Sequence, residues 1–300
     1  MNGIIIKSTG GLYTVLSGGK TYDCRARGAF RRKKSPLLVG DRCVFDADER
    51  NGYVINEISP RKNELIRPAI SNIDELIVAF AAKSPDPDLL HTDKLVSAAQ
   101  NLGITPVIVI TKADLDENAA ENFSRIYKST GYATFVTSSA KNTGISELSE
   151  YIKSRSDKTF SFAGASGVGK SSLMNALFPS IELETGEISS KIERGKHTTR
   201  AVSLYELNRD FPDATGFIAD TPGFSMLDFV NFDFFGLDAL PHTFAEFESL
   251  LGKCRWRDCT HTKEDGCAIK DAVKSGAIMP ERYASYISMY EELKSKKEWQ

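Results

Sequence analysis

The sequence predicts a multidomain α/β protein made of a small β-barrel, a parallel sheet covered by helices, and a helical C-terminal unit. Three observations support this prediction. Short strand-like segments and Gly-rich turns fill the first 60 residues, and longer apolar runs then alternate with helix-like stretches. After about residue 240 the pattern becomes helical around a cluster of cysteines. We expect domains at 1–67, 68–235 and 236–300, because a 300-residue chain is long for a single domain.

The first domain has the pattern of a small closed barrel. About five short strands within 60 residues are typical of an OB-fold, and an SH3-like barrel fits the same pattern. Cys24 and Cys43 lie within these segments, where we expect them to act as small apolar fillers. The expected strands are Ile4–Lys7, Leu12–Leu16, Thr21–Arg25, Arg42–Asp46 and Tyr53–Ile58.

Charge is distributed unevenly along the chain. Residues 1–67 contain 13 Lys and Arg residues against seven Asp and Glu residues, whereas residues 68–249 contain 15 against 25. A basic first domain attached to an acidic second one suggests a polyanionic partner, and a merely solvated basic surface is the alternative. In OB-folds, the loops between strands often contact nucleic acid. We therefore expect the longest inter-strand loop of the barrel to bind RNA. Its cations are Arg31, Arg32, Lys33 and Lys34.

The second domain has the pattern of an α/β nucleotide domain. Continuous apolar strands separated by helices predict a parallel sheet with helices on both faces. Helix-like stretches include Asp93–Leu102 and Ser171–Leu177. The apolar runs are Leu76–Ala81, Val107–Ile110, Ala133–Val136, Phe160–Ala163 and Phe217–Ala219.

A phosphate-binding loop follows one of these strands. Residues 164–171 fit the pattern G-x-x-x-x-G-K-[ST], in which glycines let backbone N–H groups wrap around phosphates. Lys170 is expected to reach the β- and γ-phosphates as a catalytic cation, and Ser171 to ligate Mg²⁺. A chance Gly-rich turn is the alternative. The expected phosphate-site residues are Gly164, Ala165, Ser166, Gly167, Val168, Gly169, Lys170, Ser171 and Ser172.

Two further motifs indicate that the base is guanine. A carboxylate at Asp114 can accept hydrogen bonds from the N1–H and the exocyclic amine of guanine, which adenine does not offer. A second turn, also just after a strand, can direct a backbone N–H at the guanine oxygen. The expected guanine-site residues are Thr111, Lys112, Ala113 and Asp114 in the first turn, and Ser139, Ala140 and Lys141 in the second.

Two segments have the composition of nucleotide switches. In the DTPG motif, Asp220 is expected to hold Mg²⁺ through a water, and the Gly223 N–H to contact the γ-phosphate. Upstream, Thr198 or Thr199 can complete the Mg²⁺ shell, although an ordinary surface loop is the alternative. His197 is a candidate for positioning the attacking water, or it only hydrogen-bonds within the loop.

The C-terminal unit contains a set of metal ligands. Cys254, Cys259, His261 and Cys267 offer three thiolates and one imidazole, a full tetrahedral set for a structural zinc ion. Three cysteines so close together favour a metal site over disulfides, because the first residues of the sequence do not have the pattern expected of a secretion signal. An aromatic–cationic surface between the ligands is suited to RNA. It consists of Arg255, Trp256, Arg257 and Lys263, of which the first three are the expected RNA contacts.

Taken in chain order, the motifs are TKAD, SAK, GASGVGKS, GKHTT and DTPG. A typical small GTPase has the phosphate loop first, so this order is circularly permuted. With the basic barrel in front and the Cys-x4-Cys-x-His-x5-Cys cluster behind, the sequence closely resembles the RsgA family (YjeQ or YloQ) over essentially its whole length. The departures are small: Thr111 where Asn is commoner, which is expected to weaken the phosphate-loop tether slightly, and Lys196 where Arg is frequent.

The resemblance implies an N-terminal OB-fold, a circularly permuted P-loop GTPase domain and a C-terminal helical zinc-binding domain. It also implies late maturation of the bacterial small (30S) ribosomal subunit, with contacts to the subunit and its 16S rRNA. GTP would be hydrolysed to GDP and phosphate with Mg²⁺, faster when the subunit is present. His197 matches the histidine of the family's switch. We expect a cytoplasmic monomer without membrane contact, with other assembly factors as further candidate partners.

Two other classes of function fit parts of the pattern. A metabolic P-loop kinase would share the phosphate loop but would not need the SAK turn or the basic barrel. A non-catalytic RNA-binding scaffold would use GTP only as a ligand, and Phe224 stands where a Ras-like GTPase has its water-orienting Gln.

Overall fold

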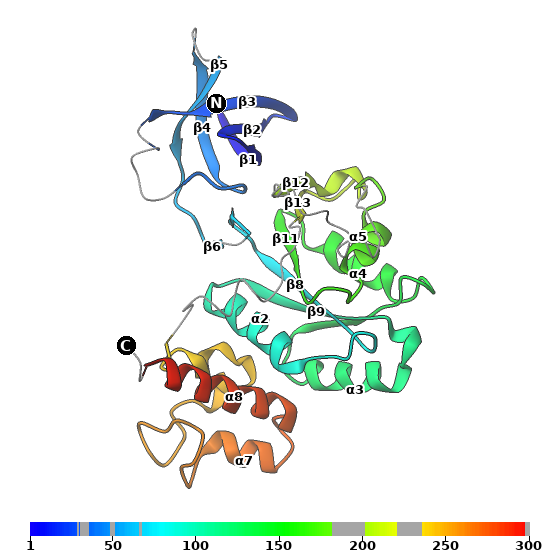
Figure 1. The fold of residues 1–300 in the computed structure, drawn as a ribbon, viewed down its shortest axis with the longest axis vertical. Coiled ribbons are helices and arrows are strands. Elements are labelled where there is room, and N and C mark those ends of the chain that lie inside the picture. Colours follow the sequence, from blue (N-terminus) through cyan, green and yellow to red (C-terminus); the bar gives the residue numbers. More distant parts are fainter. Residues whose placement is uncertain are drawn as a thin grey trace, which may run out of the picture.

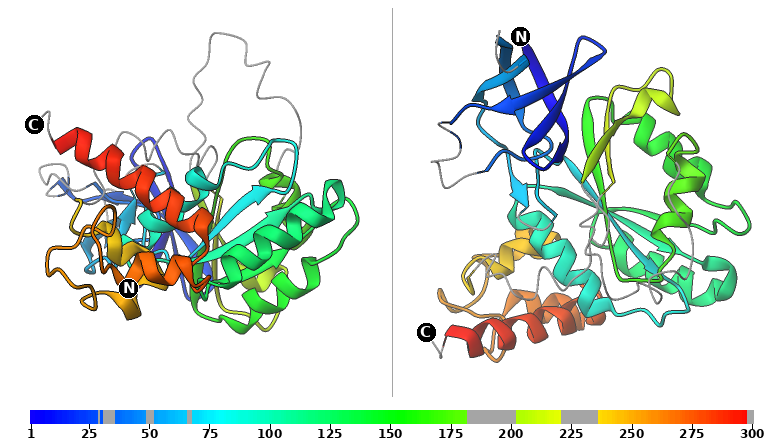
Figure 2. Two further views of the ribbon diagram at one scale, coloured as in Figure 1. Left: turned by 90° about the horizontal axis from the view of Figure 1, so that it is seen from below. Right: turned by 45° about the horizontal axis from the view of Figure 1, so that its top comes forward.

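The computed structural model describes residues 1–28, 30, 36–48, 52–65, 68–181, 202–220 and 236–297. A small barrel, a central sheet with helices on both faces and a helical C-terminal unit follow one another through the molecule (Figures 1 and 2). None of its described helices is long and apolar enough to cross a membrane.

The barrel closes through five strands. Strand β1 pairs with both β2 and β4, β2 pairs with β3, and β5 lies between β3 and β4, so each strand has two neighbours. The interior is apolar and includes Cys24 and Cys43, which confirms their role as fillers. The strands overlap all five predicted segments: β1 (Asn2–Thr9), β2 (Leu12–Ser17), β3 (Lys20–Ala26), β4 (Arg42–Asp48) and β5 (Gly52–Ile58).

The central sheet has the strand order β10-β9-β8-β11-β13-β12. All its neighbours are parallel except β12, which runs antiparallel to β13 and was not expected from the sequence. The strands are β8 (Glu75–Ala81), β9 (Thr105–Thr111), β10 (Ala133–Val136), β11 (Lys158–Ala163), β12 (Ser203–Glu206) and β13 (Gly216–Asp220).

Helices cover both faces of this sheet, as predicted. Alternate residues of β9 point to opposite faces, so Ile108 packs in one core cluster and Val107 in the other. The first cluster lies beneath α2 (Leu89–Asn101) and α3 (Glu117–Lys128). The second lies beneath α4 (Ile145–Ser154) and α5 (Lys170–Leu177), on the other side in Figure 1.

Strand pairing and the linker both join the barrel to the sheet. Lys7 of β1 pairs with Ser203 of β12, so barrel and sheet form one continuous ladder. Near the linker, buried Asp41 accepts hydrogen bonds from Arg61 and from the Ser71 hydroxyl. The linker hairpin of β6 (Glu64–Leu65) and β7 (Ile70–Ser71) is therefore held against the barrel.

The C-terminal unit is built from α7 (Ala268–Lys274), α8 (Pro280–Lys297) and two short 3₁₀ helices. The prediction of one helix over 242–251 was wrong in detail. Phe244 adopts an extended backbone between η3 (Leu240–Thr243) and η4 (Ala245–Leu250). This break allows Phe244 and Phe247 to stack within the buried core of the unit, so packing outweighs helical periodicity.

Candidate nucleotide site and metal centre

The phosphate loop leaves the carboxyl end of β11 and enters α5. A Cβ at Gly164 would lie 2.0 Å from the Ala79 carbonyl oxygen, so no other residue fits this approach of two backbones. Gly169 has a φ of 97°, which turns the chain directly into the helix at Lys170. Glycines are therefore required here by geometry as well as by the space that phosphate oxygens need.

Lys170 lies folded over this loop. Its ammonium donates hydrogen bonds of 2.7 Å to the carbonyl oxygens of Gly164 and Ala165. Burial lowers the pKa of Lys170 to about 8. A cation held in this way can exchange backbone carbonyls for phosphate oxygens, which restore the stability of its charged form.

The predicted guanine turn is tied directly to the phosphate loop. The Thr111 hydroxyl lies within hydrogen-bonding distance of the carbonyl oxygens of Phe80 and Val168. The expected weakening at Thr111 therefore finds no support in this geometry, since threonine still reaches the phosphate loop. Lys112 turns through a left-handed backbone and donates to the Ser84 carbonyl.

Asp114 is oriented by a residue that the sequence reasoning missed. The Ser138 hydroxyl hydrogen-bonds to Asp114 Oδ1, and the Lys141 N–H donates to the same serine oxygen at 3.1 Å. Ser138 therefore both closes the second turn and fixes the carboxylate. The run Thr137-Ser138-Ser139 offers adjacent hydroxyls, and the sequence alone does not indicate that Ser138 is the one that faces Asp114.

The nucleotide motifs meet at one edge of the sheet. The strands β8, β9, β11 and β13 are parallel, so the residues after their carboxyl ends lie together. Asp220 ends β13, beside the strand that leads into the phosphate loop. The remaining predicted site residues lie outside the described residues. They are Arg31, Arg32, Lys33 and Lys34 of the barrel loop, and His197, Thr198, Thr199 and Gly223 of the switches.

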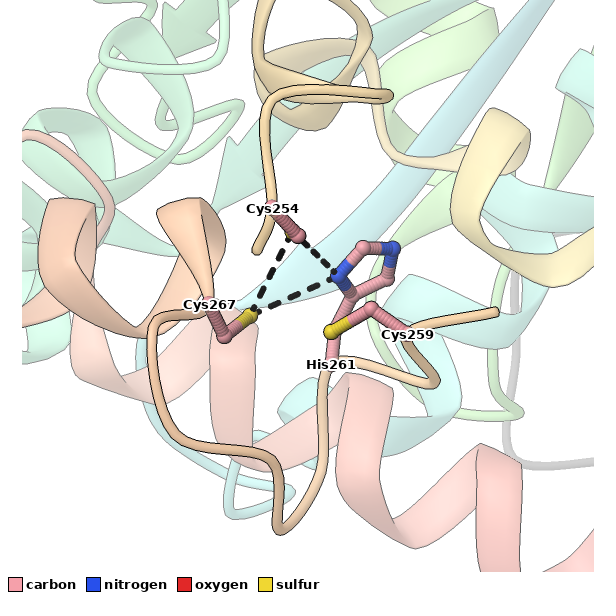
Figure 3. A group of neighbouring side chains, drawn as sticks. All are labelled: Cys254, Cys259, His261 and Cys267. Atoms are coloured by element: carbon pink, nitrogen blue, oxygen red, sulfur yellow. Dashed lines mark hydrogen bonds between the residues drawn. The ribbon is translucent and has the colours of Figure 1, made fainter. Parts of the chain in front are cut away.

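The predicted metal ligands converge in the C-terminal unit (Figure 3). One ligand atom from each of Cys254, Cys259, His261 and Cys267 lies within 4.8 Å of all the others. The Cys254 and Cys267 sulfurs are 3.9 Å apart and lie 3.5 and 3.4 Å from His261 Nδ1. A zinc tetrahedron with ordinary bond lengths has edges of about 3.8 Å between sulfurs and about 3.6 Å from sulfur to nitrogen. The cluster is therefore compatible with zinc.

The loop that carries these ligands is held on two sides. The Glu264 carboxylate accepts hydrogen bonds from the backbone N–H groups of Thr260 and Thr262, which flank His261. From α8, the hydroxyls of Tyr283 and Tyr286 donate to the carbonyls of His261 and Thr260, each at 2.8 Å. The imidazole therefore faces the thiols because both neighbouring peptides are fixed.

The predicted aromatic–cationic surface lies on the outside of the same loop. Trp256 is 52% exposed, and its indole N–H donates to the Asp265 carbonyl. The Arg255 guanidinium lies over the Trp256 ring, 5.2 Å from its centroid, and Arg257 is also exposed. The stacked pair presents a flat, positively charged surface to solvent.

The fold and the site define a P-loop GTPase whose guanine-reading turns precede its phosphate loop in the chain. Family models for the RsgA GTPase and the RsgA N-terminal domain match residues 58–230 and 2–55. The chain is 44% identical, over 98% of both chains, to the small ribosomal subunit biogenesis GTPase RsgA of Geobacillus kaustophilus. It is 40% identical to the protein of that name in Halalkalibacterium halodurans, over 98% of this chain and 97% of the relative.

Solved structures agree with this classification. YjeQ from Thermotoga maritima superposes with a TM-score of 0.81 at 32% identity, covering 97% of this chain and 98% of the other. YloQ, described as a circularly permuted GTPase, gives 0.77 at 34% identity, covering 98% and 95%. The chain belongs to the RsgA GTPase family. Its activity is GTP hydrolysis, with GTP as the substrate, GDP as a product and Mg²⁺ as the cofactor. The kinase and the non-catalytic scaffold are thereby excluded.

Proposed function

We propose that this GTPase acts in late maturation of the small ribosomal subunit, in the cytoplasm and as a monomer. The observation that carries the proposal is likeness over the whole chain: relatives named for small-subunit biogenesis align with 98% of it. All three units of the fold are included in that alignment, so the proposal concerns the complete arrangement of barrel, GTPase domain and C-terminal unit.

Two surfaces are proposed to bind the subunit's 16S rRNA. The barrel loop supplies Arg31–Lys34, whose charges would neutralise phosphates. The C-terminal unit supplies the exposed Arg255–Trp256 stack, which suits an unpaired base. Together they would let the first and the last unit of the chain both contact RNA, and assembly factors near the subunit are further candidate partners.

The proposed roles in hydrolysis follow from the geometry of the loop. Lys170 would neutralise charge on the β- and γ-phosphates, while Ser171 and Asp220 would hold Mg²⁺ together with Thr198 or Thr199. Bound Mg²⁺ would supply charge neutralisation at the transferred phosphate. His197 is proposed to position the attacking water, and Asp114, aligned by Ser138, to read guanine.

One structural zinc ion is proposed for the C-terminal unit. Three cysteines and His261 fill all four positions of a tetrahedron, so the site offers no open position for catalysis. The metal would supply folding free energy to the loop that presents the RNA-binding stack.

Hydrolysis of GTP with and without purified small subunits tests the proposed function. We expect the subunit to raise the rate by at least about tenfold, as partners that complete a GTPase site do. Large subunits at the same concentration provide the matched control and should leave the rate unchanged. A ratio near one with small subunits, or equal stimulation by large subunits, would overturn the proposal.

A further inference from the structure

Helix α8 buries a charged side chain that the hydrolysis scheme does not use. Arg282 is 1% exposed, pairs with Asp93 of α2, and lies 2.7 Å from Glu246 of η4. Its guanidinium lies 4.6 Å from the centroid of the Phe244 ring, while the Tyr127 hydroxyl of α3 donates to Asp93 at 2.9 Å. Burial raises the pKa of Asp93, and one of its oxygens has no hydrogen-bond partner among the described residues, whereas the Arg282 guanidinium contacts both carboxylates and the Phe244 ring. Moving a buried guanidinium away from such partners is costly, so this joint between α2 and α8 has few alternative arrangements.

The same helix also holds the loop 254–267, which carries the predicted metal ligands. Tyr283 and Tyr286 follow Arg282 within about one turn, and their hydroxyls donate to the backbone of His261 and Thr260. Helix α8 therefore connects α2 of the GTPase domain to the ligand loop of the C-terminal unit. Arg282, Tyr283 and Tyr286 all lie in the first two turns of α8, so displacement of Arg282 also displaces the two tyrosines.

The start of α2 reaches the nucleotide motifs. Asp88 caps the helix by accepting a hydrogen bond from the His91 N–H, which anchors the preceding segment 82–88. Within that segment, the Ser84 carbonyl accepts from Lys112 of the guanine turn. Pro85 lies 3.9 Å from the position that a Cβ would take at Gly167 of the phosphate loop. Both the base-reading turn and the phosphate loop thus touch the segment that leads into α2.

We propose that the Asp93–Arg282 joint couples guanine-nucleotide binding to the C-terminal metal unit through α2 and α8. This route starts at the base and at the phosphate loop, so GDP engages it as fully as GTP does. It is distinct from transmission through the switch segments, which depends on the γ-phosphate. Coupling of this kind is reciprocal, so the state of the metal unit also changes nucleotide affinity.

Amide hydrogen exchange on the full, zinc-loaded chain separates the two routes. Exchange is compared without nucleotide, with GDP, and with a non-hydrolysable GTP analogue. We expect GDP alone to slow exchange in α8 and in the ligand loop 254–267 by about fivefold or more, the usual range of coupling between sites. If amide exchange slows only with the GTP analogue, or slows with neither nucleotide, the proposal is overturned.

Three variants locate the coupling at the joint. Arg282→Met removes the cation, and Asp93→Asn removes the opposing charge while keeping a side chain of the same shape; both should abolish the GDP effect and still bind zinc. If Arg282→Met does not fold, Asp93→Asn alone decides. The control, Lys94→Met, breaks the more exposed Lys94–Glu292 pair between the same two helices and should retain the effect. Full GDP-dependent slowing in Asp93→Asn would contradict the assignment.

Discussion

At the scale of single residues, the guanine recognition proposed for Asp114 depends on how firmly its carboxylate is held. Asp114 follows β9, and its side chain can rotate unless a neighbour restrains it. Ser138 supplies that restraint from the end of the adjacent strand β10, and its own oxygen is fixed by the Lys141 N–H. The carboxylate is thus aligned before the base arrives, which reduces the entropy lost on binding.

Ser138→Ala should weaken binding of GTP and GDP about tenfold, since a hydrogen bond to a charged group contributes about 1.5 kcal/mol. The maximal rate of hydrolysis should change little, because the base does not take part in the reaction. Fluorescent GDP titration measures the affinity. The matched control is Ser139→Ala, which removes the neighbouring hydroxyl of the same turn and keeps every backbone N–H. A larger loss in Ser139→Ala than in Ser138→Ala would reverse the assignment.

The lowered pKa of Lys170 predicts that nucleotide binding takes up protons. Its pKa of about 8 lies below the ordinary lysine value because burial disfavours the charged form. Nucleotide phosphates restore the charge, so GTP binding at pH 8 should take up about half a proton, and almost none at pH 6.5. Calorimetry in buffers of different ionisation enthalpy measures this uptake. Equal uptake at both pH values would contradict a lowered pKa.

At the scale of secondary-structure elements, a strand or helix could be predicted from the sequence only where its local pattern determines the structure. All seven residues of β8 are buried, and such a strand reads directly as an apolar run. By contrast, β12 is a four-residue strand of mixed composition that is recognised only from its pairing with β13 and β1. The break at Phe244 likewise reflects burial of its ring, which a helical pattern does not reveal.

The barrel contains two buried cysteines, and the loop 254–267 contains three cysteines that are predicted metal ligands. Burial raises the pKa of Cys24 to about 11 and that of Cys43 to about 12, so both remain protonated thiols at neutral pH. The other three cysteines belong to the cluster that is compatible with zinc. After chelation, a disulfide reagent at pH 7.5 should therefore modify three thiols quickly and leave two unreacted.

Before chelation, the same reagent should modify none of the five thiols quickly, because metal binding protects the cluster. Released zinc, measured with a colorimetric indicator, should equal one ion per chain. Five fast thiols after chelation would show that the barrel does not bury Cys24 and Cys43 as described. Three fast thiols without chelation would count against a metal in the cluster.

At the scale of the whole molecule, contacts between the three units were hidden from sequence reasoning. Arg282 lies in a polar helix and reads as a surface residue until Asp93 and Glu246 converge on it from distant parts of the chain. The same holds for the pairing of Lys7 with Ser203, which joins the barrel to the sheet. Motif spacing reveals the chemistry of each site, but a single sequence does not indicate which charges meet across domains.

The unequal distribution of charge supports a final prediction about how the whole molecule reaches RNA. If the barrel loop contacts phosphates, a triple variant of its cations should weaken binding to small subunits, while GTP hydrolysis without subunits stays unchanged. The triple variant is Arg31→Gln/Arg32→Gln/Lys34→Gln. The slope of log affinity against log salt should become shallower by about 2, since each lost single-strand contact removes roughly 0.7. Arg125→Gln/Lys128→Gln/Lys153→Gln removes three exposed cations from the GTPase domain and is the charge-matched control. Equal slopes for the two triple variants would mean that the barrel loop contributes net charge and makes no specific phosphate contacts.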